Sequence, residues 1–410
     1  MSVAADSLLL HSGGFRPSFL KRGLDSDSDE LESRILKRRK KTEETIIRSE
    51  ESQESAVCAA SASSSSGPDE KEECSPLPGS APVMGSVCAE TDSGCARYIE
   101  FKDLWLLGSD ELARLRARHV ENLLQRKKLC MVLDLDHTLL HSARITPDKE
   151  AYLRDPPAGS FMVAPHIMTK PRPFVGEFLK EASSMFEMYI YTMGTAGYGA
   201  AVAKRLDPGA DYFGTRVISR GDGSDKNQKS LDLVLAHDRA VVILDDTESV
   251  WSRHSENLIL IEKYNFFDSG ADESEHDGIL ASVLQVLKRI HCDFFDDPSE
   301  SRDVRRGLRS LRRGVLEGCE IVFSGVIPRL VQPEAHQLWP LAEELGAKCC
   351  REVGPSVTHV VAARVGTKKA RWAVQENKFL VDQKWIEAVN FRWKRLPENE
   401  FPVETTHQND

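Results

Sequence analysis

The strongest constraint on the fold comes from residues 129–142, which read LCMVLDLDHTLLHS. The run opens with five consecutive apolar residues. An apolar run without polar alternation is typical of a strand that is buried on both faces of a sheet. Asp134 and Asp136 then stand at the carboxyl end of that strand, where side chains two residues apart leave the same face. Two carboxylates can therefore converge on one group.

Further strands and helices alternate along the chain after this run. We predict strands at 186–192, 216–219, 240–246 and 257–261. We predict helices at 174–183, 198–206 and 230–236, and a closing helix at 278–290. This alternation is typical of an α/β fold, a parallel sheet with helices on both faces. Ligands of such sheets bind at the carboxyl ends of the strands, where the acids stand.

Residues 143–171 interrupt the alternation too early to form a crossover helix. They contain Asp155-Pro156-Pro157 and Gly159, which favour turns. We interpret the segment as an inserted hairpin or lid over the acidic strand end.

Composition divides the chain into four parts. Residues 1–95 hold 11 Lys/Arg and 17 Asp/Glu, many serines and few large apolar residues, so we predict that they are disordered. One α/β domain is predicted at 98–297, and a second, smaller α/β domain at 315–405. The segment 298–314 between them is rich in arginine. It reads either as an exposed linker helix or as a substrate-binding element.

The N-terminal segment carries a candidate address for the nucleus. Lys21-Arg22 precede a second basic run at 37–41, after a spacer of 14 residues. This is the layout of a two-part nuclear import signal, and a solvated charge cluster is the alternative. The nine cysteines show no C-x-x-C spacing, so neither a zinc site nor a disulfide framework is expected. A reducing compartment, the nucleus, fits both observations.

The charge and hydropathy of the chain argue against two kinds of partner. The sequence carries 54 Lys/Arg and 64 Asp/Glu, a net charge of -10. A nucleic-acid-binding protein needs a strongly basic face, so no direct contact with nucleic acid is expected. The apolar runs stop short of the ~18 residues of a membrane span, so no membrane partner is expected.

Four further polar residues follow the acids in an order that suits phosphate chemistry. Thr192 ends one predicted strand, Lys229 precedes a predicted helix, and Asp245 and Asp246 end another strand. With Asp134 they supply a carboxylate nucleophile, a hydroxyl and an ammonium for phosphate oxygens, and carboxylates for a divalent cation. An isolated D-x-D-x-T also occurs as a turn or helix cap, so the complete order favours catalysis more than the motif alone.

These motifs, taken together, resemble a known family. Their order resembles the haloacid dehalogenase (HAD) superfamily. Within it, LDLDHTLLHS, RPFVGEFL, YTMG, KSL, ILDD with Trp251, and KYNFF resemble the phosphatases of the C-terminal domain (CTD) of RNA polymerase II. VFSG, VTHVV, TKKA and Lys384-Trp385-Ile386 in the second domain resemble a BRCT domain. The combination is similar to the transcription-factor-IIF-associated branch, and the serine-rich N-terminus to its plant CTD-phosphatase-like members.

The resemblance implies a DxDxT-type protein serine phosphatase that works through an aspartyl-phosphate. Asp134 would be the nucleophile, and Asp136 would protonate the departing serine oxygen and then activate water. Thr192 and Lys229 would hold the phosphoryl oxygens. Thr138 would orient the loop that carries the acid.

The resemblance also implies Mg²⁺, with Mn²⁺ or Co²⁺ as alternatives. The Asp134 carboxylate, the Asp136 backbone carbonyl and Asp246 would bind the ion, with Asp245 in contact with it or one layer behind. Arg172 would either reach the phosphate or cap the lid, and both roles stay open.

In the BRCT-like domain, Ser324 and Lys369 match the positions that bind phosphate in phosphopeptide-reading members, and Thr367 adds a contact. A single BRCT domain also serves as a protein contact without reading phosphate, so both readings stay open. The implied partners are the phosphorylated CTD and transcription factor IIF. Larger members carry a long acidic segment after this domain, whereas this sequence stops at VETTHQND, so factor IIF is the less secure partner.

Three functions are compatible with these features. The leading hypothesis is a Mg²⁺-dependent phosphatase of the heptad-repeat tail of RNA polymerase II, tethered by its BRCT domain. A catalytically silent phosphoprotein scaffold is disfavoured by the complete set of catalytic residues. A phosphatase of small metabolites is disfavoured by the BRCT domain and the import signal.

Overall fold

The computed structural model describes residues 109–223, 225, 227–299 and 301–404, and the backbone of strands β1 (Val87–Glu90) and β2 (Ala96–Ile99). The candidate import signal lies outside the described residues. Strand β1 falls inside the segment 1–95 and pairs antiparallel with β2, with Val87 opposite Ile99 and Cys88 opposite Tyr98. Valine, isoleucine and tyrosine favour strands, which is the local reason for this pairing.

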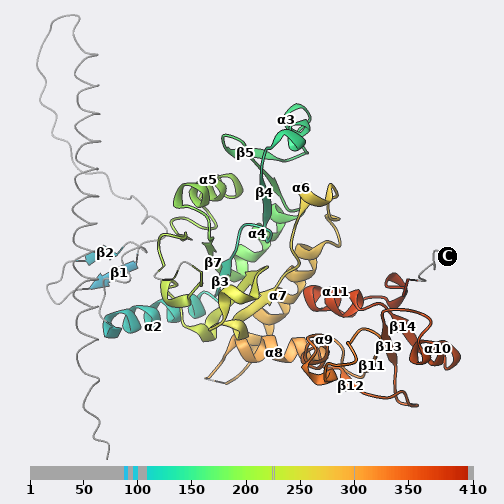
Figure 1. Ribbon diagram of the computed structural model, residues 1–410. Helices are drawn as coiled ribbons and strands as arrows, with labels where there is room; N and C mark the ends of the chain where they lie inside the picture. The colour runs from blue at the N-terminus through green and yellow to red at the C-terminus, as the bar shows by residue number, and fades with distance from the viewer. Residues whose placement is uncertain are drawn as a thin grey trace, which may run out of the picture. The chain divides into compact units, whose positions relative to one another are not determined.

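A five-stranded parallel sheet confirms the predicted α/β fold (Figure 1). Its strand order is β10-β9-β3-β7-β8. The strands are β3 (Leu129–Leu133), β7 (Phe186–Tyr191), β8 (Val217–Ile218), β9 (Val241–Asp245) and β10 (Leu258–Leu260). Strand β3 lies at the centre with all five residues buried, as its apolar run predicts. The aspartates after β3 and at the end of β9 therefore meet at the carboxyl ends of two neighbouring strands.

Helices pack on this sheet, and one predicted helix is wrong. The helices are α2 (Ser109–Gln125), α4 (Val175–Met185), α5 (Ala196–Leu206) and α7 (Ile279–Asp296). Residues 230–236 form only a single 3₁₀ turn, Leu231–Leu233. Leu231, Val234, Leu235 and Ala236 are buried and Asp232 is exposed, but Val234 adopts an extended conformation that ends the turn before a helix can continue.

The insertion forms a small antiparallel sheet, which we call the lid sheet. It contains β4 (Leu140–Arg144), β5 (Phe161–Ala164) and β6 (Ile167–Pro171) in the order β4-β6-β5. A short helix, α3 (Ala151–Arg154), joins β4 to β5. Figure 1 shows β4, β5 and α3 extending away from the main sheet. The predicted hairpin or lid is thus present.

The second domain is a four-stranded parallel sheet in the order β12-β11-β13-β14. Its strands are β11 (Glu320–Ser324), β12 (Lys348–Cys350), β13 (His359–Ala362) and β14 (Phe379–Val381). Its helices are α9 (Leu338–Glu344), α10 (Lys368–Gln375) and α11 (Lys384–Arg392). Pro340 lies in the first turn of α9, where a missing N–H costs no hydrogen bond.

The arginine-rich connector forms a helix, α8 (Val304–Gly314). Its Val304 and Leu308 are buried in the core of the first domain, and Trp393 from the second domain joins the same core. Arg312 donates a hydrogen bond to Asn390 and pairs with Glu344 of the second domain. The connector therefore joins the two domains through buried contacts, and their proposed boundaries stay a prediction.

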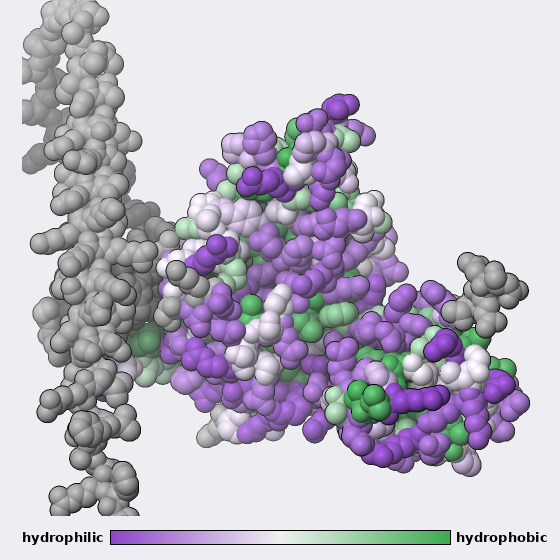
Figure 2. Space-filling model, in the orientation of Figure 1, coloured by the Kyte–Doolittle hydropathy of each residue, from purple (hydrophilic) through white to green (hydrophobic). Residues whose placement is uncertain are grey.

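In the part of the chain that the structure describes, none of the helices has the length and apolar character to cross a membrane. The surface in Figure 2 is mostly hydrophilic, with apolar residues scattered across it.

Candidate active site

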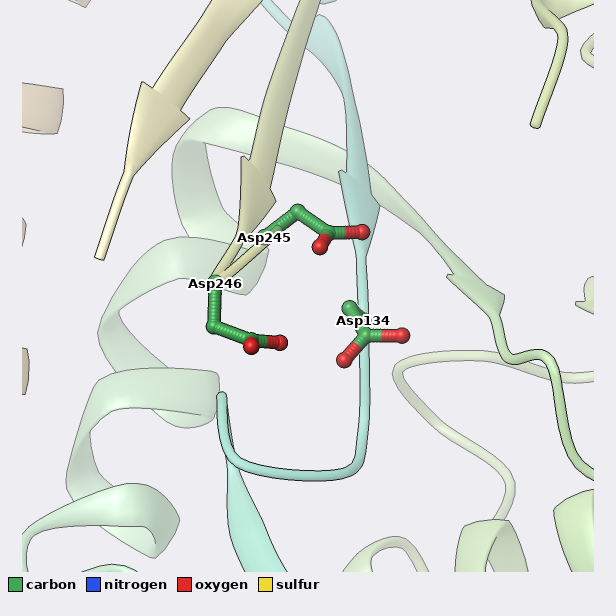
Figure 3. Close-up of side chains that lie close together, drawn as sticks. All are labelled: Asp134, Asp245 and Asp246. Carbon is green, nitrogen blue, oxygen red and sulfur yellow. The ribbon is translucent and has the colours of Figure 1, made fainter. Parts of the chain in front are cut away.

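Three carboxylates meet at the carboxyl ends of β3 and β9 (Figure 3). Asp134 follows β3, Asp245 ends β9, and Asp246 comes next in the chain. One oxygen from each of the three lies within 4.8 Å of the others. Asp134 and Asp245 are buried, and Figure 3 shows the three side chains facing a common space. The structure thus brings together three of the four predicted metal ligands through their side chains.

Lys229 reaches this cluster from the loop before β9. Its ammonium lies 2.5 Å from Oδ1 of Asp134 and 2.6 Å from Oδ2 of Asp245. The rings of Tyr191 and Trp251 flank the ammonium at 5.7 and 5.8 Å. Because these rings exclude water from the ammonium, its electrostatic attraction to the neighbouring carboxylates is stronger than it would be in water.

The charges of the cluster do not balance. Burial raises the pKa of Asp134 to about 8, and the carboxylates of Asp245 and Asp246 add to this effect against the opposing Lys229 ammonium. Burial lowers the pKa of Lys229, but the carboxylates of Asp134 and Asp245 outweigh it, so the lysine stays charged. When all three acids are ionised, the buried Lys229 ammonium and the exposed Lys263 beside Asp246 leave one negative charge unbalanced. Oxygen ligands with excess negative charge are suited to a divalent cation.

Asp245 and Asp246 make different contacts. The Asp245 carboxylate accepts hydrogen bonds from Trp251 Nε1 at 2.8 Å and from the Thr247 amide at 2.8 Å, besides its pair with Lys229. Asp246 accepts from the Thr247 hydroxyl at 2.9 Å and lies 3.5 Å from the exposed Lys263. Asp245 therefore fixes Lys229, whereas the Asp246 side chain, which is 6% exposed, has no contact with that ammonium among the described contacts.

Asp136 points to a different neighbour, Tyr198. The Tyr198 hydroxyl donates to Oδ1 of Asp136 at 2.5 Å, and burial raises the pKa of this acid although that hydrogen bond opposes the shift. The same hydroxyl lies 2.7 Å from the Ser142 hydroxyl, which lies 2.8 Å from that of Thr169. A chain of hydrogen bonds thus runs from the lid sheet to the acid. Sequence reasoning missed Tyr198, although its place in the first turn of the helix after Thr192 is a usable signal.

Thr192 follows β7 and is 1% exposed. Its amide donates to the Ile218 carbonyl, and its Oγ1 accepts from the Gly194 amide at 2.9 Å. A Cβ atom at Gly194 would lie 2.6 Å from the Tyr198 ring, so this close approach requires glycine. The motif Thr-Met-Gly therefore places the hydroxyl and leaves room for the tyrosine that contacts Asp136.

Arg172 is held by the protein itself. Its guanidinium pairs with Glu273, with Nη2 at 2.6 Å from Oε1, and donates to the Thr138 carbonyl at 3.0 Å. The side chain is buried, so in this arrangement it braces the loop after Asp136. The Thr138 hydroxyl lies 3.5 Å from Oδ1 of Asp246, and its role in orienting that loop stays a prediction. Glu273 was not foreseen, because it is 101 residues away in the sequence.

The second domain holds a separate polar group. The hydroxyl groups of Ser324 and Thr367 lie 2.7 Å apart, and Thr367 also caps α10. The Lys369 ammonium donates to the backbone carbonyl of Arg351. A cavity of 280 Å³ lies beside these residues and is lined by the cations of Arg329, Arg351 and Lys369.

Comparisons with known proteins agree with this geometry. Residues 129–304 match the NLI interacting factor-like phosphatase family, and residues 312–389 match the BRCT (BRCA1 C Terminus) domain. The chain is 47% identical to RNA polymerase II C-terminal domain phosphatase-like 4 of Arabidopsis thaliana, over 82% of this chain and 83% of that relative. It is 37% identical to phosphatase-like 3 of the same plant, over 72% of this chain but only 28% of that longer relative.

A solved structure extends the similarity to three dimensions. The structure of Fcp1, an essential RNA polymerase II CTD phosphatase, aligns with a TM-score of 0.58 and 28% identity. The alignment covers 71% of this chain and all of that one. With an acidic cluster at the carboxyl ends of a parallel sheet, a lid sheet and a BRCT domain, the chain belongs to the family of RNA polymerase II CTD phosphatases.

Proposed function

We propose that this phosphatase removes phosphate from phosphoserines in the heptad-repeat tail of RNA polymerase II, and that it acts in the nucleus. The carrying observation is the buried Lys229 ammonium, 2.5 Å from Asp134 at the carboxyl end of β3. A cation beside a candidate nucleophile stabilises the charge of a transferring phosphoryl group. We infer the substrate from the relatives, which are named as CTD phosphatases. A silent scaffold is disfavoured, because no catalytic group is missing.

The reaction is proposed to occur in two steps at Asp134. In the first, an Asp134 oxygen attacks the phosphorus, the bond to the serine oxygen breaks, and Asp136 gives its proton to that oxygen. In the second, Asp136 takes a proton from water, whose oxygen attacks the phosphorus and releases the Asp134 carboxylate. The raised pKa of Asp136 suits its first role, since a general acid must be protonated. Thr192 and Lys229 hold the phosphoryl oxygens.

The donor set fits Mg²⁺. We propose that the Asp134 carboxylate, the Asp136 backbone carbonyl and Asp246 hold the ion, and that Asp245 acts through Lys229. Magnesium takes few protein carboxylates and keeps several waters, which suits three ligands. When bound, the ion neutralises charge on the phosphoryl oxygens.

Metal binding is expected to depend steeply on pH. Because the pKa of Asp134 is raised to about 8 and binding needs its ionised form, the apparent affinity for Mg²⁺ should rise about tenfold per pH unit below pH 8. The folding stability of the metal-free protein should change with pH in the opposite direction. Its folded form holds a proton that the unfolded chain has lost, so its stability should fall as pH rises from about 4 to about 8. Thermal denaturation with and without Mg²⁺ at pH 6, 7 and 8 measures both effects.

The variant Asp134→Asn provides the control for this pH dependence. It carries no titrating group at that position, so the Mg²⁺-induced shift in melting temperature should be small and nearly independent of pH. A wild-type shift that does not change between pH 6 and 8 would show that Asp134 does not bind the metal.

Tyr198 is expected to tune the acid. Removing the Tyr198 hydroxyl in Tyr198→Phe leaves Asp136 without a hydrogen bond that lowers its pKa, so that pKa should rise further. We expect kcat to fall about tenfold and its alkaline limb to move to higher pH, because the acid stays protonated longer. A pH profile of kcat measures this. Ser142→Ala keeps the Tyr198–Asp136 contact and should shift the limb less.

For the BRCT domain we propose phosphate recognition by Ser324 and Lys369; Lys369 lines the 280 Å³ cavity, and Ser324 stands in the sequence between its lining residues Phe323 and Gly325. The neighbouring cations Arg329 and Arg351 favour an anionic ligand. Lys369→Ala should weaken binding of a phosphorylated heptad peptide to the full chain by about tenfold and leave the unphosphorylated peptide unaffected. Equal binding of the phosphorylated peptide by wild type and Lys369→Ala would favour a BRCT domain that contacts a protein without reading phosphate. Transcription factor IIF is the candidate for that partner.

The test of the proposed function is phosphate release from heptad peptides that carry one phosphate, at the second or the fifth serine position. We expect release that requires Mg²⁺ and disappears with a chelator, and the ratio of the two rates gives the site preference. Folded wild-type protein that releases phosphate from neither peptide with Mg²⁺ present would contradict the proposal.

A further inference from the structure

Helix α8 presents a row of arginines that the active site does not use. The helix carries five arginines and no acidic residue. Arg306, Arg309 and Arg313 are exposed and are spaced by three and four residues, so they share one face. Arg309 pairs with Glu256. Within residues 109–404 as described, no acidic partner of Arg306 or Arg313 is found.

Three adjoining cavities surround this helix, with volumes of 460, 390 and 480 Å³. Each is lined by several of its arginines, and Arg305, Arg306, Arg309 and Arg313 each line two of them. Arg116 from α2 lines the third. The surface around α8 in Figure 2 is mostly hydrophilic. We call this surface the α8 arginine cluster; it comprises Arg116, Arg302, Arg305, Arg306, Arg309, Arg312 and Arg313.

Two of these arginines have unused donors. The Nε atoms of Arg116 and Arg312 are buried and lack a hydrogen-bond acceptor among the described atoms. A buried donor without an acceptor costs free energy, so the protein does not fully satisfy the hydrogen bonding of these two guanidinium groups. The guanidinium fork matches the oxygens of a phosphoryl group. Both observations point to a phosphate ligand.

The cluster lies at the end of the sheet opposite the active site. Helix α8 packs on the 3₁₀ turns Asp238–Ala240 and Ser255–Asn257, which directly precede β9 and β10. The active-site carboxylates follow the carboxyl ends of β3 and β9. A phosphate at α8 is therefore a different phosphate from the one that is hydrolysed.

We propose that the α8 arginine cluster docks a second phosphoserine of a multiply phosphorylated heptad-repeat tail while another occupies the active site. The identity of the occupant rests on the proposed function. Carboxylates also line these cavities, among them Glu248, Glu256, Glu343 and Glu344. They would repel the continuous charge of a nucleic-acid backbone but leave room for isolated phosphates. The charge pattern therefore favours a phosphopeptide.

The length of the sheet and the length of the heptad repeat are compatible with this proposal. A strand of five residues spans about 17 Å, and a seven-residue repeat spans up to about 23 Å when extended. Two phosphates that are one or two repeats apart can thus reach both ends of the sheet. Binding the second phosphate raises the effective concentration of the first at Asp134.

The experiment compares two substrates with the full chain. One is a single-repeat peptide with one phosphate, and the other is a four-repeat tail with a phosphate in each repeat. The double variant Arg306→Glu/Arg313→Glu reverses two exposed charges that make no ion pair among the described residues, so the fold should be retained. We expect its kcat/KM for the short peptide to stay within twofold of wild type. Its KM for the long tail should rise about tenfold.

The matched control is Arg114→Glu/Arg118→Glu, which reverses two exposed arginines of α2 outside the three cavities. It should leave the KM for the long tail within twofold of wild type. Equal KM values for wild type and the α8 variant would overturn the docking site, as would an equal loss in the control. A larger loss in binding of single-stranded RNA than of the tail would also overturn it in favour of nucleic acid. Failure of wild type to hydrolyse either peptide would instead reject the proposed function.

Discussion

Replacing Asp134 with asparagine is expected to reduce phosphate release by at least about a thousandfold while the domain stays folded. The amide cannot attack phosphorus, so no aspartyl-phosphate can form. The stability of the fold should not fall, because the ionised form of Asp134 destabilises the metal-free structure, as its raised pKa of about 8 indicates. At pH 8 the metal-free variant should melt no lower than wild type. Single-turnover release from a monophosphorylated heptad peptide and thermal denaturation measure the two effects.

The contrast with Asp136 sharpens this test. Asp136→Asn keeps the nucleophile and removes the acid, so a phosphorylated enzyme should form slowly and persist, detectable by mass of the intact protein. In Asp134→Asn no such species should form. Turnover that survives in Asp134→Asn would refute Asp134 as the nucleophile.

Replacing Lys229 with alanine is expected to damage both activity and stability. The ammonium is 2% exposed and sits between Asp134 and Asp245. Removing one partner of a buried ion pair leaves uncompensated charge and costs about 3 kcal/mol. Activity should fall about a thousandfold, because the transferring phosphoryl group loses its fixed cation. Urea unfolding without metal measures the first loss, and peptide hydrolysis measures the second.

Lys263 gives the matched comparison for stability. It also contacts a carboxylate of the cluster, Asp246 at 3.5 Å, but its side chain is 57% exposed. Water screens such a pair, so Lys263→Ala should change the free energy of unfolding by less than about 1 kcal/mol. Similar losses in the two variants would show that burial of Lys229 does not control its contribution. Added Mg²⁺ should recover part of the stability of Lys229→Ala.

The features that could be predicted from the sequence are those that local patterns determine. The apolar run before Asp134 predicts a strand buried on both faces, and the carboxyl ends of parallel strands lie at one end of the sheet. Because β3 and β9 are neighbours, Asp134 converges with Asp245 and Asp246. The side-chain partners could not be predicted in this way. Tyr198 reaches Asp136, and Glu273 reaches Arg172, because of the paths that loops take after the strands. Apolar residues at 231–236 predicted a helix, but the backbone becomes extended at Val234 and only a single turn forms.

The burial of Trp393 in the core of the catalytic domain determines how cooperatively the two domains unfold. Two domains that share core residues lose those contacts together, so we expect one cooperative calorimetric transition over the described domains rather than two. Protease digestion under native conditions should not release an intact BRCT fragment. For the engineer, a BRCT domain from another protein cannot simply be exchanged here, because its last helix must also complete the hydrophobic core of its neighbour.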